Sequence, residues 1–210
     1  MVATTDDDCP AKNRIMDHAL TLFRQSGFSR VPVEEITSGL GMSKKTFYKC
    51  FESKEDLVHQ MILRITGEIG TQIEAIITTD RPFAAKLNAL IGVLHTRFTK
   101  FSTPFLRDCQ LHAPASWEYI QEFRRTKIIA VWGQLIEQGQ REGFIRASID
   151  PRLLLLAIVG VVESVVNPQT LSNESFSTEQ AMAGIVDMIF RGIFTEAALR
   201  TIDVPHVTHH

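Results

Sequence analysis

The chain has 210 residues, 44% of them hydrophobic, and a formal net charge of −2. This length and apolar content suffice to bury a full core, and they fit a small domain joined to a larger one. The near-neutral charge excludes a protein that binds polyanions over its whole surface. The longest apolar run, residues 153–162, is too short to span a bilayer, so we expect no membrane segment.

The two ends of the chain, residues 1–10 and 201–210, are predicted to be flexible tails. The opening MVATTDDDCP is acidic and polar, unlike an export signal. The three cysteines are an odd number without close spacing, which argues against a disulfide framework and favours a reducing, cytoplasmic location. The closing HVTHH is either native or the remnant of a purification tag, and we expect no metal site there.

Residues 11–52 are predicted to form a small domain of three helices. Ile15, Ala19, Leu22 and Phe23 make the inward stripe of a first helix, and residues 33–40 show the apolar spacing of a second. Two short helices separated by a tight turn are typical of a helix-turn-helix.

Gly41 lies between the second and third helices, where it can take the left-handed conformation that ends a helix. Ser43 then offers an N-cap hydroxyl, and Phe47 and Phe51 face the core from the third helix. The outer surface of that helix is left with polar and basic residues: Lys44, Lys45, Thr46, Tyr48 and Lys49. This pattern favours a surface that reads DNA.

Charge is unevenly distributed along the chain. Residues 12–54 hold eight Lys and Arg against four Asp and Glu, a local balance of +4, which leaves −6 on the rest. A basic end on an otherwise acidic protein is the footprint expected of a local nucleic-acid contact, although a merely solvated charged face would give the same count.

Residues 53–200 are predicted to form a second domain of six helices. A capping-box-like start at Ser53, with Asp56 three residues on, opens the first and longest of them. Prolines, glycines and capping residues set the approximate ranges of the six: 53–79, 83–100, 102–112, 115–143, 151–167 and 178–199. A polar loop is expected between the last two. No convincing strand is found, so the predicted class is all-α.

The helix over residues 151–167 is apolar on all sides, so it needs burial on every face. One face can pack in its own chain, and the other, together with the helix over 178–199, is predicted to form a homodimer interface. The alternative is that this is the central core helix of one chain. Glu163 interrupts the apolar run and is expected to have a partner.

From Ile15 to Met61 the chain resembles the DNA-binding domain of the tetracycline-repressor (TetR) family of bacterial transcription regulators. The resemblance rests on the first-helix stripe, Gly27-Phe28, Val33-x-x-Ile36, Leu40-Gly41-Met42-Ser43, the third helix and Ser53-Lys54-Glu55-Asp56-Leu57. The chain departs from the family pattern at Lys45, at Cys50 and at Val31-Pro32. Beyond Met61 the similarity is only that of a helical body.

The resemblance implies a homodimeric regulator, by default a repressor, that binds a partly palindromic operator in double-stranded DNA. Phosphate contacts are expected from the lysines and from the Tyr48 hydroxyl, and base contacts from Thr46 and Lys44. The complete predicted DNA-binding set is Lys44, Lys45, Thr46, Tyr48, Lys49 and Lys54. No cofactor is expected.

The resemblance also implies a pocket for a small effector in the second domain. Aromatic residues gather between positions 98 and 132, where they either line an apolar pocket or form ordinary core. The predicted ligand contacts are Phe98, Phe105, Cys109 and Phe123. Ligand entry is expected to change the head spacing and release the DNA.

Two other classes of protein fit parts of the sequence. Cys109 and His112 have a one-turn spacing that suits a metal or an activated thiol, but no second ligand pair or third partner accompanies them, so an enzyme is not expected. A helical scaffold that merely reuses the fold is the other alternative.

Overall fold

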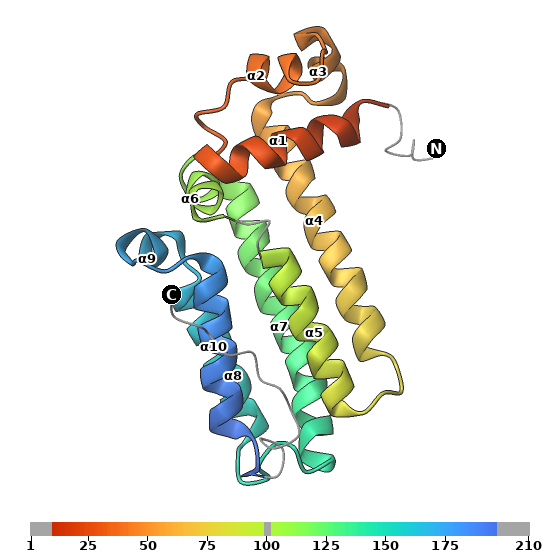
Figure 1. Cartoon of the computed structure of the whole chain (residues 1–210), viewed down its shortest axis with the longest axis vertical. Coiled ribbons are helices and arrows are strands. Elements are labelled where there is room, and N and C mark those ends of the chain that lie inside the picture. The colour runs from red at the N-terminus through yellow and green to blue at the C-terminus, as the bar shows by residue number, and fades with distance from the viewer. Residues whose placement is uncertain (1–9, 99–101, 197–210) are drawn as a thin grey trace.

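The computed structural model describes residues 10–98 and 102–196, with side chains except at 94–98, 128, 178–179 and 190. Helices make up most of this part, and its one β feature is an isolated bridge between Ile145 and Phe194 (Figure 1). The predicted all-α class is therefore confirmed. None of the helices in these two ranges is long and apolar enough to cross a membrane.

The first three helices form a small unit, the head, at one end of the molecule (Figure 1). They are α1 (Lys12–Ser26), α2 (Val33–Ser38) and α3 (Lys44–Cys50). In the predicted stripe of α1, Ile15, Ala19 and Phe23 are buried and Leu22 is partly buried, and Gly27 ends that helix with a positive φ of 79°.

The remaining helices form an elongated bundle, the body. Their bounds are α4 (Lys54–Ile77), α5 (Phe83–Phe98), α6 (Thr103–His112), α7 (Pro114–Arg141), α8 (Pro151–Val165), α9 (Pro168–Asn173) and α10 (Thr178–Ile193). Side-chain caps start several of them: Ser102 accepts from Phe105 N, and Asp150 accepts from Arg152 N and Leu153 N. Because α4 packs on α1 as well as on α5 and α7, it joins the head to the body.

The body departs from the predicted six helices in one place. The polar loop expected after Asn167 contains α9, so seven helices follow the head in the described ranges. Pro168 does end the preceding helix, but it also occupies the first turn of α9, where a missing N–H costs nothing. The Asn167 side chain caps the new helix by accepting from Gln169 N at 2.9 Å.

The helix α10 ends at Ile193, before the predicted end near Leu199; residues 197–199 of the predicted range lie outside the described residues. There the backbone leaves the helix and pairs with the loop after α7. Arg146 N donates to Ile193 O at 3.0 Å, and Thr195 N donates to Phe144 O at 2.9 Å. This pairing between distant segments of the chain interrupts the helix after Ile193 and leaves no local mark in the sequence.

The helix α6 lies between the head and the bundle (Figure 1). Its Phe105 ring stacks on Phe23 of α1, with centroids 6.4 Å apart, and meets Phe28 edge-on at 6.5 Å. All three rings are almost completely buried, so one apolar core runs from the head into the body. A shift of α6 would therefore be felt directly by α1.

Candidate nucleic-acid interface

The orientation of α3 is fixed by its first turn and by its buried face. Gly41 has a φ of 64°, the left-handed conformation predicted for the turn. Ser43 caps the helix, its Oγ accepting from Thr46 N at 3.1 Å. Phe47 and Phe51 are buried, with centroids 5.5 Å apart. These contacts leave the opposite face of α3 directed away from the head.

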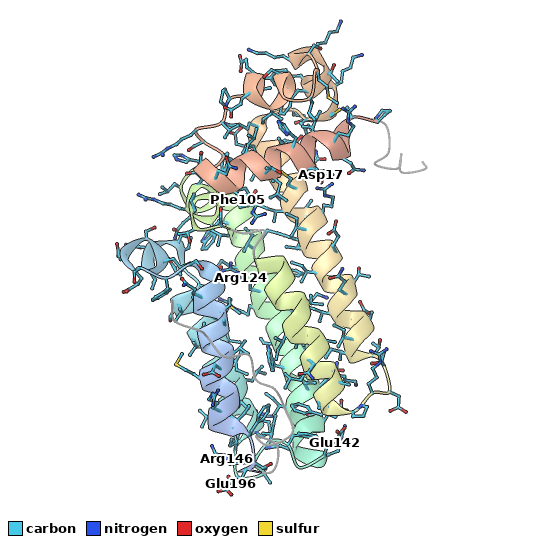
Figure 2. The ribbon with its side chains drawn as sticks, viewed as in Figure 1. Asp17, Phe105, Arg124, Glu142, Arg146 and Glu196 are labelled. Atoms are coloured by element: carbon cyan, nitrogen blue, oxygen red, sulfur yellow. The ribbon has the colours of Figure 1, made fainter. Side chains whose placement is uncertain are left out.

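That outer face carries the residues predicted to bind phosphate. Lys45 and Lys49 are exposed, and Tyr48 exposes 56% of its surface while its ring meets Phe47 edge-on at 5.2 Å. Side chains project freely from this end of the molecule in Figure 2. A phenol held at its base by a core aromatic and open at its hydroxyl is suited to donate to a phosphate.

The two predicted base contacts are more constrained than the sequence suggests. Thr46 is only partly exposed, and its hydroxyl lies 3.0 Å from Ser43 Oγ. The Lys44 ammonium forms an ion pair with Glu34 of α2, and both side chains remain more than half exposed. An exposed pair of this kind is worth little, about 0–1 kcal/mol, so DNA can displace the carboxylate.

Lys54 has a structural partner at each side. Its ammonium donates to Ser29 O and to Val31 O, both at 3.1 Å, and lies 5.9 Å from the centroid of Phe28. These contacts hold the connection between α1 and α2 against the start of α4. The capping-box-like start predicted for α4 is present: Ser53 Oγ accepts from Asp56 N at 3.0 Å, and the Asp56 carboxylate accepts from Glu52 N at 3.0 Å.

Further side chains join the head to the body, and the sequence alone did not reveal them. Asp108 of α6 accepts from Ser29 N at 2.7 Å, and its carboxylate fills the space that a Cβ at Gly27 would occupy. On the other side, Arg64 of α4 pairs with Asp17 of α1 at 2.5 Å. Asp17 is labelled in Figure 2. In the sequence these residues show only opposite charges, and their spacing along the chain does not indicate which of them pair.

Three of the four predicted ligand residues have described side chains, two on α6 and one on α7. Phe105 belongs to the junction with the head, whereas Cys109 is buried on the same helix. Phe123 is partly buried on α7, and its ring would lie 3.8 Å from a Cβ built at Gly70 of α4. The side chain of Phe98 lies outside the described residues.

The cysteines differ from what the sequence suggested. Cys50, at the end of α3, is disulfide-bonded, although the number and spacing of the cysteines argued against a disulfide framework. Spacing along the chain says nothing about which cysteines meet in space. Cys109 is free, and burial, aided by the charge of Asp108, raises the pKa of its thiol to about 12. A thiol in this state is the opposite of an activated nucleophile.

Known proteins share both the head and the overall architecture. Residues 15–61 match the model of the bacterial regulatory proteins of the tetR family. The HTH-type transcriptional regulator YvaF of Bacillus subtilis is 25% identical over 182 residues, which cover 86% of this chain and 94% of that protein. The family match covers the head, and together these comparisons support a TetR-family transcriptional regulator. The chain is a DNA-binding transcriptional regulator, and its relatives are regulators, not enzymes.

Two further comparisons extend beyond the head. The HTH-type transcriptional repressor KstR2 of Rhodococcus jostii is 23% identical over 146 residues, covering 68% of this chain and 71% of that protein. The solved structure of the ketosteroid transcriptional regulator KstR2 of Mycobacterium tuberculosis matches with a TM-score of 0.61 at 18% identity. That match covers 93% of this chain and 98% of that one, and it shows a shared fold.

Proposed function

We propose that this regulator is a repressor whose homodimer binds a partly palindromic operator and is released by a small, largely apolar effector. The observation that carries the DNA-binding surface is the exposed outer face of α3, with Lys45, Tyr48 and Lys49 free of the core. One short helix covers few base pairs, so specificity requires two of them, placed on half-sites roughly 34–36 Å apart.

The proposed contacts divide by chemistry. Lys45 and Lys49 attract phosphates, and Tyr48 donates its hydroxyl to one. Lys44 exchanges Glu34 for a guanine edge or a phosphate, and the Thr46 methyl group meets a thymine methyl while its hydroxyl stays with Ser43. Lys54 and the N-terminal N–H groups of α4 offer a further phosphate site, at the cost of the lysine's bonds to the α1–α2 connection.

The proposed dimer forms through α8 and α10. Leu153 and Leu156 of α8 and Met188 of α10 are 67%, 70% and 66% exposed, whereas Leu154 and Ile158 of α8 are buried in the chain's own core. Gly160 and Gly184 have nothing within 4 Å of the position of a Cβ, so another backbone can approach closely. An exposed apolar face on two neighbouring helices supports a second copy as its partner.

Repression and an apolar effector are supported by the relatives and by the body. KstR2 of Rhodococcus jostii is named a repressor, and a Bacillus subtilis relative, 22% identical over 188 residues, is named a fatty acid metabolism regulator protein. The contacts of α6 with the head through Phe105 and Asp108 give the route by which an effector in the body changes DNA affinity. The effector acts only through its different affinities for the two forms.

The test is binding of duplex DNA from upstream of the gene, measured by fluorescence anisotropy at several salt concentrations. We expect Lys45→Ala and Tyr48→Ala to weaken binding about tenfold or more each, and Lys45→Ala to reduce the salt slope by about one unit. Arg81→Ala is the matched control, because Arg81 is exposed in the loop after α4, far from the head (Figure 1).

Equal binding by all three variants would refute the proposed contacts of α3. A wild-type protein that binds no upstream DNA even at low salt would instead favour the alternative of a helical scaffold.

A further inference from the structure

Arg124 of α7 is a buried cation that has no counterion among the described residues. It is 8% exposed and lies on the inner side of α7, in line with Ile120 and Val131, which are equally buried. Its Nη1 donates to Val166 O at 3.1 Å and to Gln121 Oε1 at 3.3 Å. Its Nη2 is buried and has no hydrogen-bond partner, and no carboxylate of the described residues pairs with the group.

Unlike Arg124, the next arginine along α7 has a carboxylate partner. Arg125, next along α7, binds Glu163 of α8 through Nε and Nη2 at 3.1 and 3.0 Å. The predicted partner of Glu163 is thus found, and it is the exposed arginine and not the buried one. The Glu163 carboxylate, which lies one turn before Val166, therefore does not compensate the charge of Arg124.

The protein balances only part of the Arg124 charge. Val166 is the C-cap of α8, so its carbonyl lies at the negative end of that helix. The Trp117 ring lies 5.9 Å from the guanidinium and adds a cation–π contact. Burial lowers the pKa of the guanidinium to about 10, the direction expected when solvation is lost and no acid replaces it. Buried charges are otherwise paired almost without exception.

Arg124 lies next to a small apolar cluster of the body that is separate from the main core. Val162, Val166, Met182 and Ile185 form an apolar cluster separate from the main core, and Arg124 binds the last carbonyl of that cluster's helix. Figure 2 labels Arg124 in the part of the bundle below α6 and beside α9. A cation at the seam between two apolar clusters is the arrangement that suits an apolar molecule with one anionic end.

We propose that Arg124 binds the oxyanion, a carboxylate or a phosphate monoester, of the effector through its free Nη2. This inference rests on the proposed ligand response and names the chemical class of the ligand. The guanidinium is held by Val166 O and Gln121 in advance, so binding requires little reordering of the side chain. The anion then completes a hydrogen-bond set that the protein leaves open.

The experiment uses three probes with the same ten-carbon chain: decanoate, decyl phosphate and the neutral decanamide. Calorimetry on the full-length protein without DNA measures their affinities for the wild type, Arg124→Gln and Arg125→Gln. We expect the wild type and Arg125→Gln to bind one of the two anions at least tenfold more tightly than decanamide. Arg124→Gln is expected to lose that difference, and the better anion identifies the source of the oxyanion.

Two results would overturn the assignment: an anion preference that survives in Arg124→Gln, or no anion preference in the wild type. Arg124→Lys keeps the charge but not the planar donors, and we expect it to retain part of the preference, which covers the case in which Arg124→Gln does not fold. DNA binding is measured separately. Failure there would remove the regulator proposal while leaving the anion measurement intact.

Discussion

The proposed dimer face predicts that charges introduced on α8 will separate the two chains. In Leu153→Glu/Leu156→Glu the two most exposed leucines of α8 become carboxylates. These side chains expose 67% and 70% of their surface in the single chain, so the fold itself gains little from them. We therefore expect the variant to fold with nearly unchanged helical content.

The expected effect on association follows from the exposed area. Full burial of a leucine stabilises by about 1.5–3 kcal/mol, so hiding the remaining two-thirds gives about 1–2 kcal/mol for each side chain. A two-fold interface contains each leucine twice, which gives about 4–8 kcal/mol in all. The double variant should thus raise the dimer dissociation constant by about three orders of magnitude or more, before the added charge repulsion.

Sedimentation velocity over a range of micromolar concentrations measures this change as a shift from two chains to one. Leu111→Glu is the matched control, because Leu111 is 60% exposed but lies on α6, outside the proposed face. We expect Leu111→Glu to stay dimeric. A double variant that sediments as the wild type does would refute the assignment of this face.

Three further predictions concern single side chains. Glu34→Gln releases Lys44 and should tighten DNA binding several-fold in fluorescence anisotropy, more than the control Glu35→Gln does. The free energy of unfolding should change by less than about 1 kcal/mol. Equal effects of the two variants on DNA binding would contradict the pairing of Lys44 with Glu34. Phe105→Ala leaves a cavity between Phe23 and Phe28 and should lower the free energy of unfolding, measured in urea, by about 3–5 kcal/mol. Phe105→Leu should lower it by clearly less. A loss below about 1 kcal/mol for the alanine variant would contradict the packing of this ring against the head. The pKa of the Cys109 thiol is raised to about 12, so the thiol stays protonated at pH 8 and should react with a disulfide reagent only after unfolding in guanidinium. Rapid labelling of Cys109 in the native protein, detected by peptide mass spectrometry, would show that the thiol is not buried.

Local chemistry made much of the head predictable. The positive φ of Gly41, the cap at Ser43 and the buried pair Phe47 and Phe51 are properties of a few neighbouring residues, and all were expected. The exposure of Tyr48 follows from the same helical geometry. The α9 helix was missed because Asn167-Pro168 signals a helix end and a helix start equally well.

The candidate site was predictable only as far as it lies on one helix. The sequence placed the lysines on the outside of α3, but it could not tell that Lys44 meets Glu34 or that Lys54 turns back to the α1–α2 connection. It also grouped Phe105 with pocket residues, whereas that ring packs against the head. Hydrophobic spacing shows that a side chain is buried, and it does not show against which element.

The sequence by itself determined most of the helices, several of their caps, the all-α class and the resemblance of the head to the TetR family, because each depends on short-range periodicity or on a contiguous motif. Only the tertiary structure decided which charges are compensated. Arg124 and Arg125 are neighbours on α7: Arg125 pairs with Glu163 of α8, whereas Arg124 is buried and has no counterion among the described residues. That choice depends on how α7 and α8 are rotated against each other, a relation between distant segments that no local pattern encodes.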